Sequence, residues 1–136
     1  MEKNITMIGA GKMASILSRY FAKAGHNVHI GAREPEIAAQ LAQKIGHGVQ
    51  CGSIDEGILH GDIVFFAVPY LQIQDSIKLT GPLTGKTVVD MSNPLKADFS
   101  SLLLSSDTSA GEKLAKKLPK ANVVKAFNSV FATVLE

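Results

Sequence analysis

The sequence predicts a doubly wound α/β fold, in which helices cover both faces of a mostly parallel six-stranded sheet. Three observations predict it: strand-like apolar runs alternate with segments of helical period, one central run is apolar on both faces, and a glycine-rich turn follows the first run. Parallel strands joined by crossover helices commonly take the order 3-2-1-4-5-6. We expect residues 1–136 to form one domain.

The apolar runs place the six strands. They are expected at residues 5–8, 28–30, 49–51, 62–68, 86–90 and 123–127. Helices are expected between and after them, at residues 13–24, 35–45, 71–79, 109–118 and 128–136. Pro35 suits a first helical turn, and Ser53 with Glu56 has the spacing of a capping box for a further short helix. Residues 95–108 show no clear pattern.

Composition excludes several classes of protein. Fourteen basic and twelve acidic residues give a net charge of +2, which is too balanced to indicate binding to nucleic acid or anionic lipid. Cys51 is the single cysteine and cannot form an internal disulfide. No secretory signal pattern precedes Ile5, and the longest apolar run is far too short to cross a membrane. We expect a soluble cytoplasmic domain that binds small molecules.

The turn after the first strand matches the dinucleotide-binding fingerprint of Rossmann folds, Gly9-Ala10-Gly11-Lys12-Met13-Ala14. Gly9 allows a tight turn, Gly11 lets a pyrophosphate approach the backbone, and Ala14 lets the helix pack closely on the sheet. The helix start offers free N–H groups and the positive end of a dipole to phosphates. A purely structural strand-to-helix turn is the alternative.

The loop after the second strand indicates which dinucleotide is bound. NAD-binding versions place Asp or Glu there, whereas this chain has Ala32 followed by Arg33. A small neutral residue leaves room for a 2′-phosphate, and a guanidinium can grip one, so the pattern favours NADP; Lys12 would add positive charge nearby. The alternative is a solvated Arg33 that pairs with Glu34.

Three further loops end at the same edge of the predicted sheet, because right-handed crossovers bring the carboxyl ends of the strands together. We expect Val68, Pro69 and Tyr70 beside a ribose or ring, and Asn93-Pro94 and Asn128 beside the nicotinamide half. Each also has a structural interpretation: a half-buried loop tyrosine, an Asn-Pro turn and a helix N-cap.

No catalytic triad, carboxylate pair or metal-ligand spacing is present. The four histidines, at positions 26, 29, 47 and 60, are not spaced as metal ligands with Cys51 or with one another. Hydride transfer between two cofactors needs no such group, because the cofactors carry the chemistry.

Five segments together resemble the deazaflavin-dependent NADP oxidoreductase family and, similarly, the cytosolic domain of six-transmembrane metalloreductases. They are residues 8–14, 31–33, 88–94, 109–112 and 124–128. The resemblance implies hydride exchange between NADPH and a flavin or deazaflavin. It places Gly9, Gly11, Lys12 and Met13 at the pyrophosphate and Arg33 at the 2′-phosphate. It places Pro69, Asn93, Pro94 and Asn128 at the nicotinamide.

Members of that family often carry more residues after this point, so we expect a truncated member or one that completes its site from a partner subunit. Two other functions remain open: an imine reductase resembling pyrroline-5-carboxylate reductase, and a non-catalytic NADP(H)-binding or redox-sensing module. The last predicted helix has an apolar stripe that we expect to pack on the sheet, with part of it exposed in a homodimer interface.

Overall fold

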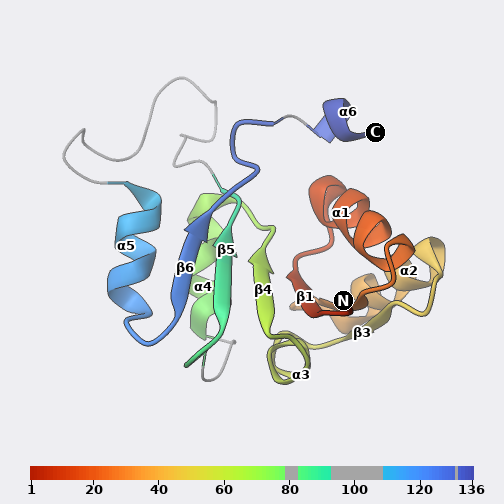
Figure 1. The fold of residues 1–136 in the computed structure, drawn as a ribbon, viewed down its shortest axis with the longest axis horizontal. Helices are drawn as coiled ribbons and strands as arrows, with labels where there is room; N and C mark the ends of the chain where they lie inside the picture. The colour runs from red at the N-terminus through yellow and green to blue at the C-terminus, as the bar shows by residue number, and fades with distance from the viewer. Residues whose placement is uncertain (79–82, 93–108, 131) are drawn as a thin grey trace.

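The sheet has the predicted topology. The structure, a computed structural model, describes residues 1–78, 83–92, 109–130 and 132–136. Its six strands are parallel and lie in the order β3-β2-β1-β4-β5-β6 (Figure 1). They are β1 (Asn4–Ile8), β2 (Asn27–Gly31), β3 (Gln50–Gly52), β4 (Ile63–Phe66), β5 (Thr87–Asp90) and β6 (Asn122–Lys125).

Helices form a layer on each face of the sheet. They are α1 (Lys12–Lys23), α2 (Pro35–Ile45), α3 (Ile54–His60), α4 (Ile73–Lys78), α5 (Ala110–Lys117) and α6 (Ala132–Leu135), with a short 3-10 turn, η1 (Tyr70–Gln72), before α4. Successive strand side chains face opposite layers. Met7 and Phe65 pack with α1 and α2, whereas Ile8 and Phe66 pack with α3, α4 and α5. The alternation explains why the central strands are apolar throughout.

Local capping decides where several helices begin. Pro35 is the first residue of α2, as predicted. Ser53 caps α3 with the predicted box: its Oγ accepts from the Glu56 amide at 3.2 Å, and its own amide donates to the Glu56 carboxylate at 2.9 Å. Ser109 caps α5 by accepting from the Glu112 amide at 3.1 Å. These caps accept hydrogen bonds from amide groups that a helix start leaves unpaired.

Some predicted boundaries are wrong. β4 ends at Phe66 rather than at Val68, because the chain bends away at the point where the strand order reverses. The helix expected from Leu71 is a 3-10 turn followed by α4, and residue 79 lies outside the described part of the chain. The patternless segment 95–108 also lies outside the described residues.

The chain after β6 departs most from the prediction. β6 ends at Lys125, and Phe127 takes a left-handed conformation (φ 63°) that turns the chain out of the strand. The amide of Val130 closes this turn on the Phe127 carbonyl at 3.3 Å, and α6 begins at Ala132 rather than directly after Asn128. α6 lies against α1 rather than on the sheet, and the Tyr20 hydroxyl donates to the Leu135 carbonyl.

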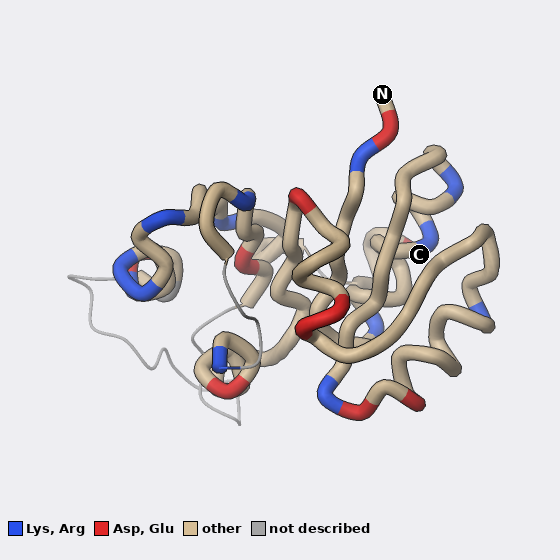
Figure 2. The backbone as a smooth tube through the Cα atoms, turned by 90° about the horizontal axis from the view of Figure 1, so that it is seen from below, with Lys and Arg blue, Asp and Glu red and all other residues tan. Residues whose placement is uncertain are grey.

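Within the described residues, no helix combines the length and the apolar character that crossing a bilayer requires. Both signs of charge occur toward both ends of the molecule in Figure 2, in keeping with a net charge of +2.

Candidate functional site

Three loops at the carboxyl edge of the sheet form a cleft of about 340 Å³. The loops follow β1, β2 and β4, so the cleft lies where the strand order reverses. This is the place at which doubly wound sheets bind ligands. Seven of the predicted site residues line it: Gly9, Ala10, Gly11, Ala32, Arg33, Val68 and Pro69.

Gly9 is a glycine that the fold requires. Its φ is 116°, a conformation that side-chain-bearing residues rarely adopt, and a Cβ there would collide with the Ala67 carbonyl oxygen. Its amide donates to the Gly31 carbonyl at 2.9 Å. The tight turn therefore brings the backbone of β1 directly against the chain leaving β4.

Gly11 differs from Gly9, because neither its backbone conformation nor its packing requires a glycine. Its φ is −84°, which any residue adopts, and a Cβ there would meet nothing within 4 Å. It caps α1 without a side-chain hydrogen bond, and the first turn of α1 holds no acidic residue. The twelve-residue helix therefore directs its free amides and positive dipole end at open space in the cleft. These features fit a phosphate-bearing ligand.

Arg33 lines the same cleft next to Ala32, which is buried and neutral. The guanidinium lies 3.7 Å from the Asp75 carboxylate of α4, and 60% of the Arg33 side chain is exposed. Asp75 also pairs with Lys78 at 3.7 Å. The alternative partner expected from the sequence, Glu34, forms no ion pair with Arg33 among the described residues, although Glu34 lines the cleft. Exposed pairs of this kind are weak, so the guanidinium is free to turn toward a ligand.

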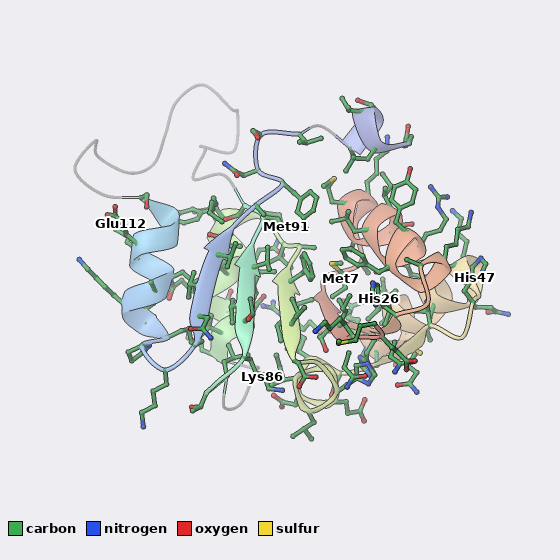
Figure 3. The ribbon with its side chains drawn as sticks, in the orientation of Figure 1. Met7, His26, His47, Lys86, Met91 and Glu112 are labelled. Atoms are coloured by element: carbon green, nitrogen blue, oxygen red, sulfur yellow. The ribbon has the colours of Figure 1, made fainter. Side chains whose placement is uncertain are left out.

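A second cleft, of about 220 Å³, continues along the edge of the sheet. It shares Ala67, Val68 and Pro69 with the first and is closed by Met13 of α1 and by Met91 and Ser92 after β5. Figure 3 shows Met91 at the carboxyl end of β5 and Lys86 at the opposite end. The two clefts are therefore neighbours along this edge of the sheet, one lined by Gly11 and the other by Met13 of α1.

The remaining predicted site residues lie elsewhere. Lys12 pairs with Glu136 at 2.7 Å and lines neither cleft. Tyr70 packs half-buried against the core beneath α4, and Asn128 lies in the turn after β6. Asn93 and Pro94 fall outside the described residues.

Sequence reasoning missed several residues that line the clefts. Those of the first cleft are Ile8, Glu34, Ile37, Ile54, Ala67, Gln72 and Ser76. The sequence placed Ile37 in the apolar stripe of α2 but gave no sign that it lines a cleft. In the structure 44% of Ile37 is exposed, and it lines the first cleft. In the second cleft, Met91 and Ser92 could be suspected from the sequence only because they precede the predicted Asn93-Pro94 turn.

Titratable groups away from the clefts do not form a metal site. Among the residues that the structure describes, no three His, Cys, Asp or Glu side chains gather to hold a metal ion. His29 is buried beneath α3, and its Nδ1 has no hydrogen-bond partner there. Burial lowers the pKa of His29, His60 lowers it further, and Glu56 opposes the shift.

Comparison with known sequences agrees with this geometry. A family model described as NADP oxidoreductase, coenzyme F420-dependent, matches residues 4–94. The metalloreductase STEAP3 of Rattus norvegicus is 30% identical over 132 residues, which are 97% of this chain and 26% of the metalloreductase. The NADP(+) shikimate dehydrogenase of Methanococcoides burtonii is 42% identical over 65 residues, 46% of this chain and 24% of that enzyme.

Solved structures extend the similarity to the fold. A putative F420-dependent NADP-reductase from Arthrobacter sp. FB24 matches with a TM-score of 0.86 at 25% identity, over 97% of this chain and 65% of that one. A hypothetical protein of Sinorhizobium meliloti, SMa0349, matches with a TM-score of 0.87 at 30% identity, over 98% and 65%. An imine reductase from Bacillus cereus shares the fold alone, with a TM-score of 0.70 at 20% identity over 92% and 40%.

This chain spans about a quarter of the curated relatives and about two-thirds of the two bacterial structures. The family model nevertheless covers most of the chain, including the glycine turn, Arg33 and the strands that form both clefts. The chain therefore belongs to the coenzyme F420-dependent NADP oxidoreductase family and forms a domain with a Rossmann fold.

Proposed function

We propose that this domain binds NADP(H) along the two clefts and serves hydride transfer between NADP(H) and a flavin or deazaflavin. The observation that carries the proposal is the pairing of two features in one cleft. Gly11 leaves room that the fold does not need, and Arg33 brings a positive charge beside the neutral Ala32. One feature suits the pyrophosphate and the other suits the 2′-phosphate.

The first cleft would hold the adenosine half. The amides at the start of α1 would donate to the pyrophosphate oxygens across Gly11. Arg33 would exchange its weak contact with Asp75 for the 2′-phosphate, which carries more charge and accepts two parallel hydrogen bonds. Ile37 and Ile54 would give the adenine an apolar wall.

The second cleft would hold the nicotinamide half. Met13, Pro69 and Met91 line it and would exclude water from one side of the ring. By the family resemblance, Asn93, Pro94 and Asn128 would complete this wall. When bound, the nicotinamide supplies the hydride chemistry itself, so the protein needs to position it rather than to provide an acid or a base.

The flavin-type acceptor rests on the family and on the name of the Arthrobacter relative. Mixing protein and NADPH with FMN, FAD or a deazaflavin, and following loss of nicotinamide absorbance, tests it. Oxidation with one of these supports the proposal. Turnover only with an imine such as pyrroline-5-carboxylate favours the imine reductase instead, and tight NADPH binding without oxidation by any acceptor favours a binding module.

We infer a cytoplasmic location, since a single cysteine suits a reducing compartment. We also infer that the ligands are small molecules, since the nearly neutral net charge does not favour nucleic acid. We also propose a homodimer through α6, on which Val134 is 72% exposed. A monomeric mass by analytical ultracentrifugation at micromolar concentration would refute the dimer.

The sharpest test of the cofactor is the variant Arg33→Ala. Loss of a charge-assisted contact of ~1.5–3 kcal/mol should weaken NADPH binding about ten- to a hundredfold, while NADH binding changes little. Fluorescence titration with both nucleotides measures this. Lys44→Ala, which removes an exposed cation from the far end of α2, is the matched control. Equal affinity of the unmodified protein for NADPH and NADH would contradict the assignment of Arg33.

A further inference from the structure

A buried carboxylate lies directly behind the second cleft. Asp90, the last residue of β5, is completely buried. Its Oδ1 accepts from the Ser92 amide at 2.9 Å and from the Ser92 hydroxyl at 2.7 Å, and its Oδ2 accepts from Lys125 Nζ at 3.1 Å. Both oxygens are therefore occupied, as a buried charge requires.

Lys125 joins this network from the neighbouring strand. It is the β6 residue opposite Asp90 in the parallel register, and 29% of its side chain is exposed. Besides Asp90, its ammonium group donates to the carbonyl of Ser92. Ser92 is thus held through its amide, its hydroxyl and its carbonyl by two side chains.

Met91 and Ser92 together form the part of the second cleft's wall that comes from the loop after β5. Asp90 and Lys125 themselves do not line this cleft, so they act on it only through that wall. The bonds from Ser92 to Asp90 close the turn within the loop itself, whereas Lys125 adds a connection from this loop to β6.

We propose that Lys125 and Asp90 are positioning residues that set the nicotinamide-side wall of the site, without contributing to the adenosine side. The inference rests on the proposed NADP(H) function. It predicts that breaking the pair weakens binding of the nicotinamide half and spares binding of the adenosine half, because Asp90, Ser92 and Lys125 are not among the residues that line the cleft containing Gly11 and Arg33.

The test compares two ligands in equilibrium titrations: NADPH, and adenosine 2′,5′-bisphosphate, which lacks the nicotinamide half. In Lys125→Met we expect NADPH binding to weaken at least tenfold and adenosine 2′,5′-bisphosphate binding to change less than twofold. Lys125→Arg, which keeps the charge and can reach both oxygens, should restore most of the NADPH affinity. Lys120→Met, an exposed lysine before β6, is the control and should match the unmodified protein.

Lys125→Met leaves Asp90 as a buried charge without its cation and can fail to fold. The double variant Asp90→Asn/Lys125→Met removes both charges and still lacks the contact to the Ser92 carbonyl, so it should show the same selective loss of NADPH. Equal weakening of both ligands, or no weakening of either, in the folded variants overturns the inference. If the unmodified protein binds neither ligand, the proposed function itself fails.

Discussion

Two regions of the molecule contain glycines whose surroundings are opposite: one is crowded and the other is open. Beneath α3, a Cβ at Gly57 would lie 2.9 Å from Thr6 Cγ2 and 3.1 Å from His29 Nδ1, and one at Gly61 would lie 2.8 Å from the Thr6 amide. In the turn between β1 and α1, a Cβ at Gly11 would meet nothing within 4 Å.

The contrast separates glycines that the fold needs from a glycine that it leaves for something else. Where a neighbour fills the space of the side chain, glycine is a packing requirement. Where the space is open and φ is ordinary, a glycine leaves room for a ligand to approach the backbone. Gly9, only two residues before Gly11, belongs to the first kind. The glycine turn therefore divides into Gly9, which the packing requires, and Gly11, which the packing leaves open and where we propose that the pyrophosphate binds.

The largest effect is expected for Gly9→Ala. A left-handed backbone and a collision with the Ala67 carbonyl should together cost about 3–5 kcal/mol in the free energy of unfolding. Urea denaturation followed by circular dichroism measures it. Gly25→Ala separates the two causes, because Gly25 also has a positive φ (91°) but open space around it. Equal costs for the two variants would show that the contact with Ala67 contributes nothing.

Gly57→Ala should destabilise the protein by about 2 kcal/mol, because overpacking against Thr6 outweighs the better helix propensity of alanine. Thermal and urea denaturation measure the change. Adding Thr6→Ser removes the crowded methyl group and keeps the hydroxyl that donates to the Gly57 carbonyl. The double variant should recover part of the loss; a stabilised Gly57→Ala would refute close packing under α3.

Gly11→Ala should lower the free energy of unfolding by no more than about 1 kcal/mol, the cost of a poorer N-cap, because the position is unpacked. NADPH binding should nevertheless weaken about tenfold, or ~1.4 kcal/mol, since the new methyl group occupies the approach to the α1 amides. Titration and denaturation on the same sample check both halves. Unchanged NADPH affinity in Gly11→Ala would show that the open space at Gly11 is not needed for binding, which would contradict the comparison of the two kinds of glycine.

The smallest effect concerns His29, which packs against Gly57. Its pKa lies below the ordinary 6.5, so the unfolded chain takes up a proton more readily than the folded protein does. The free energy of unfolding should be highest above pH 6.5 and should fall as the pH drops from there through the lowered pKa. Urea denaturation at a series of pH values measures the slope.

His29→Gln should flatten this slope, because no buried imidazole then resists protonation. His47→Asn is the control: His47 is exposed with φ 54°, a conformation that asparagine tolerates, and its loss should leave the slope unchanged. An identical slope in both variants would place the pH dependence elsewhere.

Sequence reasoning was most successful where residues close together in the chain determine the local structure. The start of α2 at Pro35 and the box of Ser53 with Glu56 follow from capping within a few residues, whereas the strand order followed from the fold class that the alternating pattern indicates. It failed after β6, where Phe127 takes a left-handed conformation and its ring centroid lies 6.3 Å from that of Phe65. That contact joins residues far apart in the chain.

By itself, the sequence determined the doubly wound sheet, the glycine turn and the edge at which the site lies, because periodicity and local chemistry act over short distances. Only the tertiary structure decided that Gly9 is packed and Gly11 open, that Arg33 meets Asp75 rather than Glu34, and that Lys125 holds Asp90 and Ser92. Each of these depends on the distance between atoms from different elements, and that distance exists only once the layers have packed together.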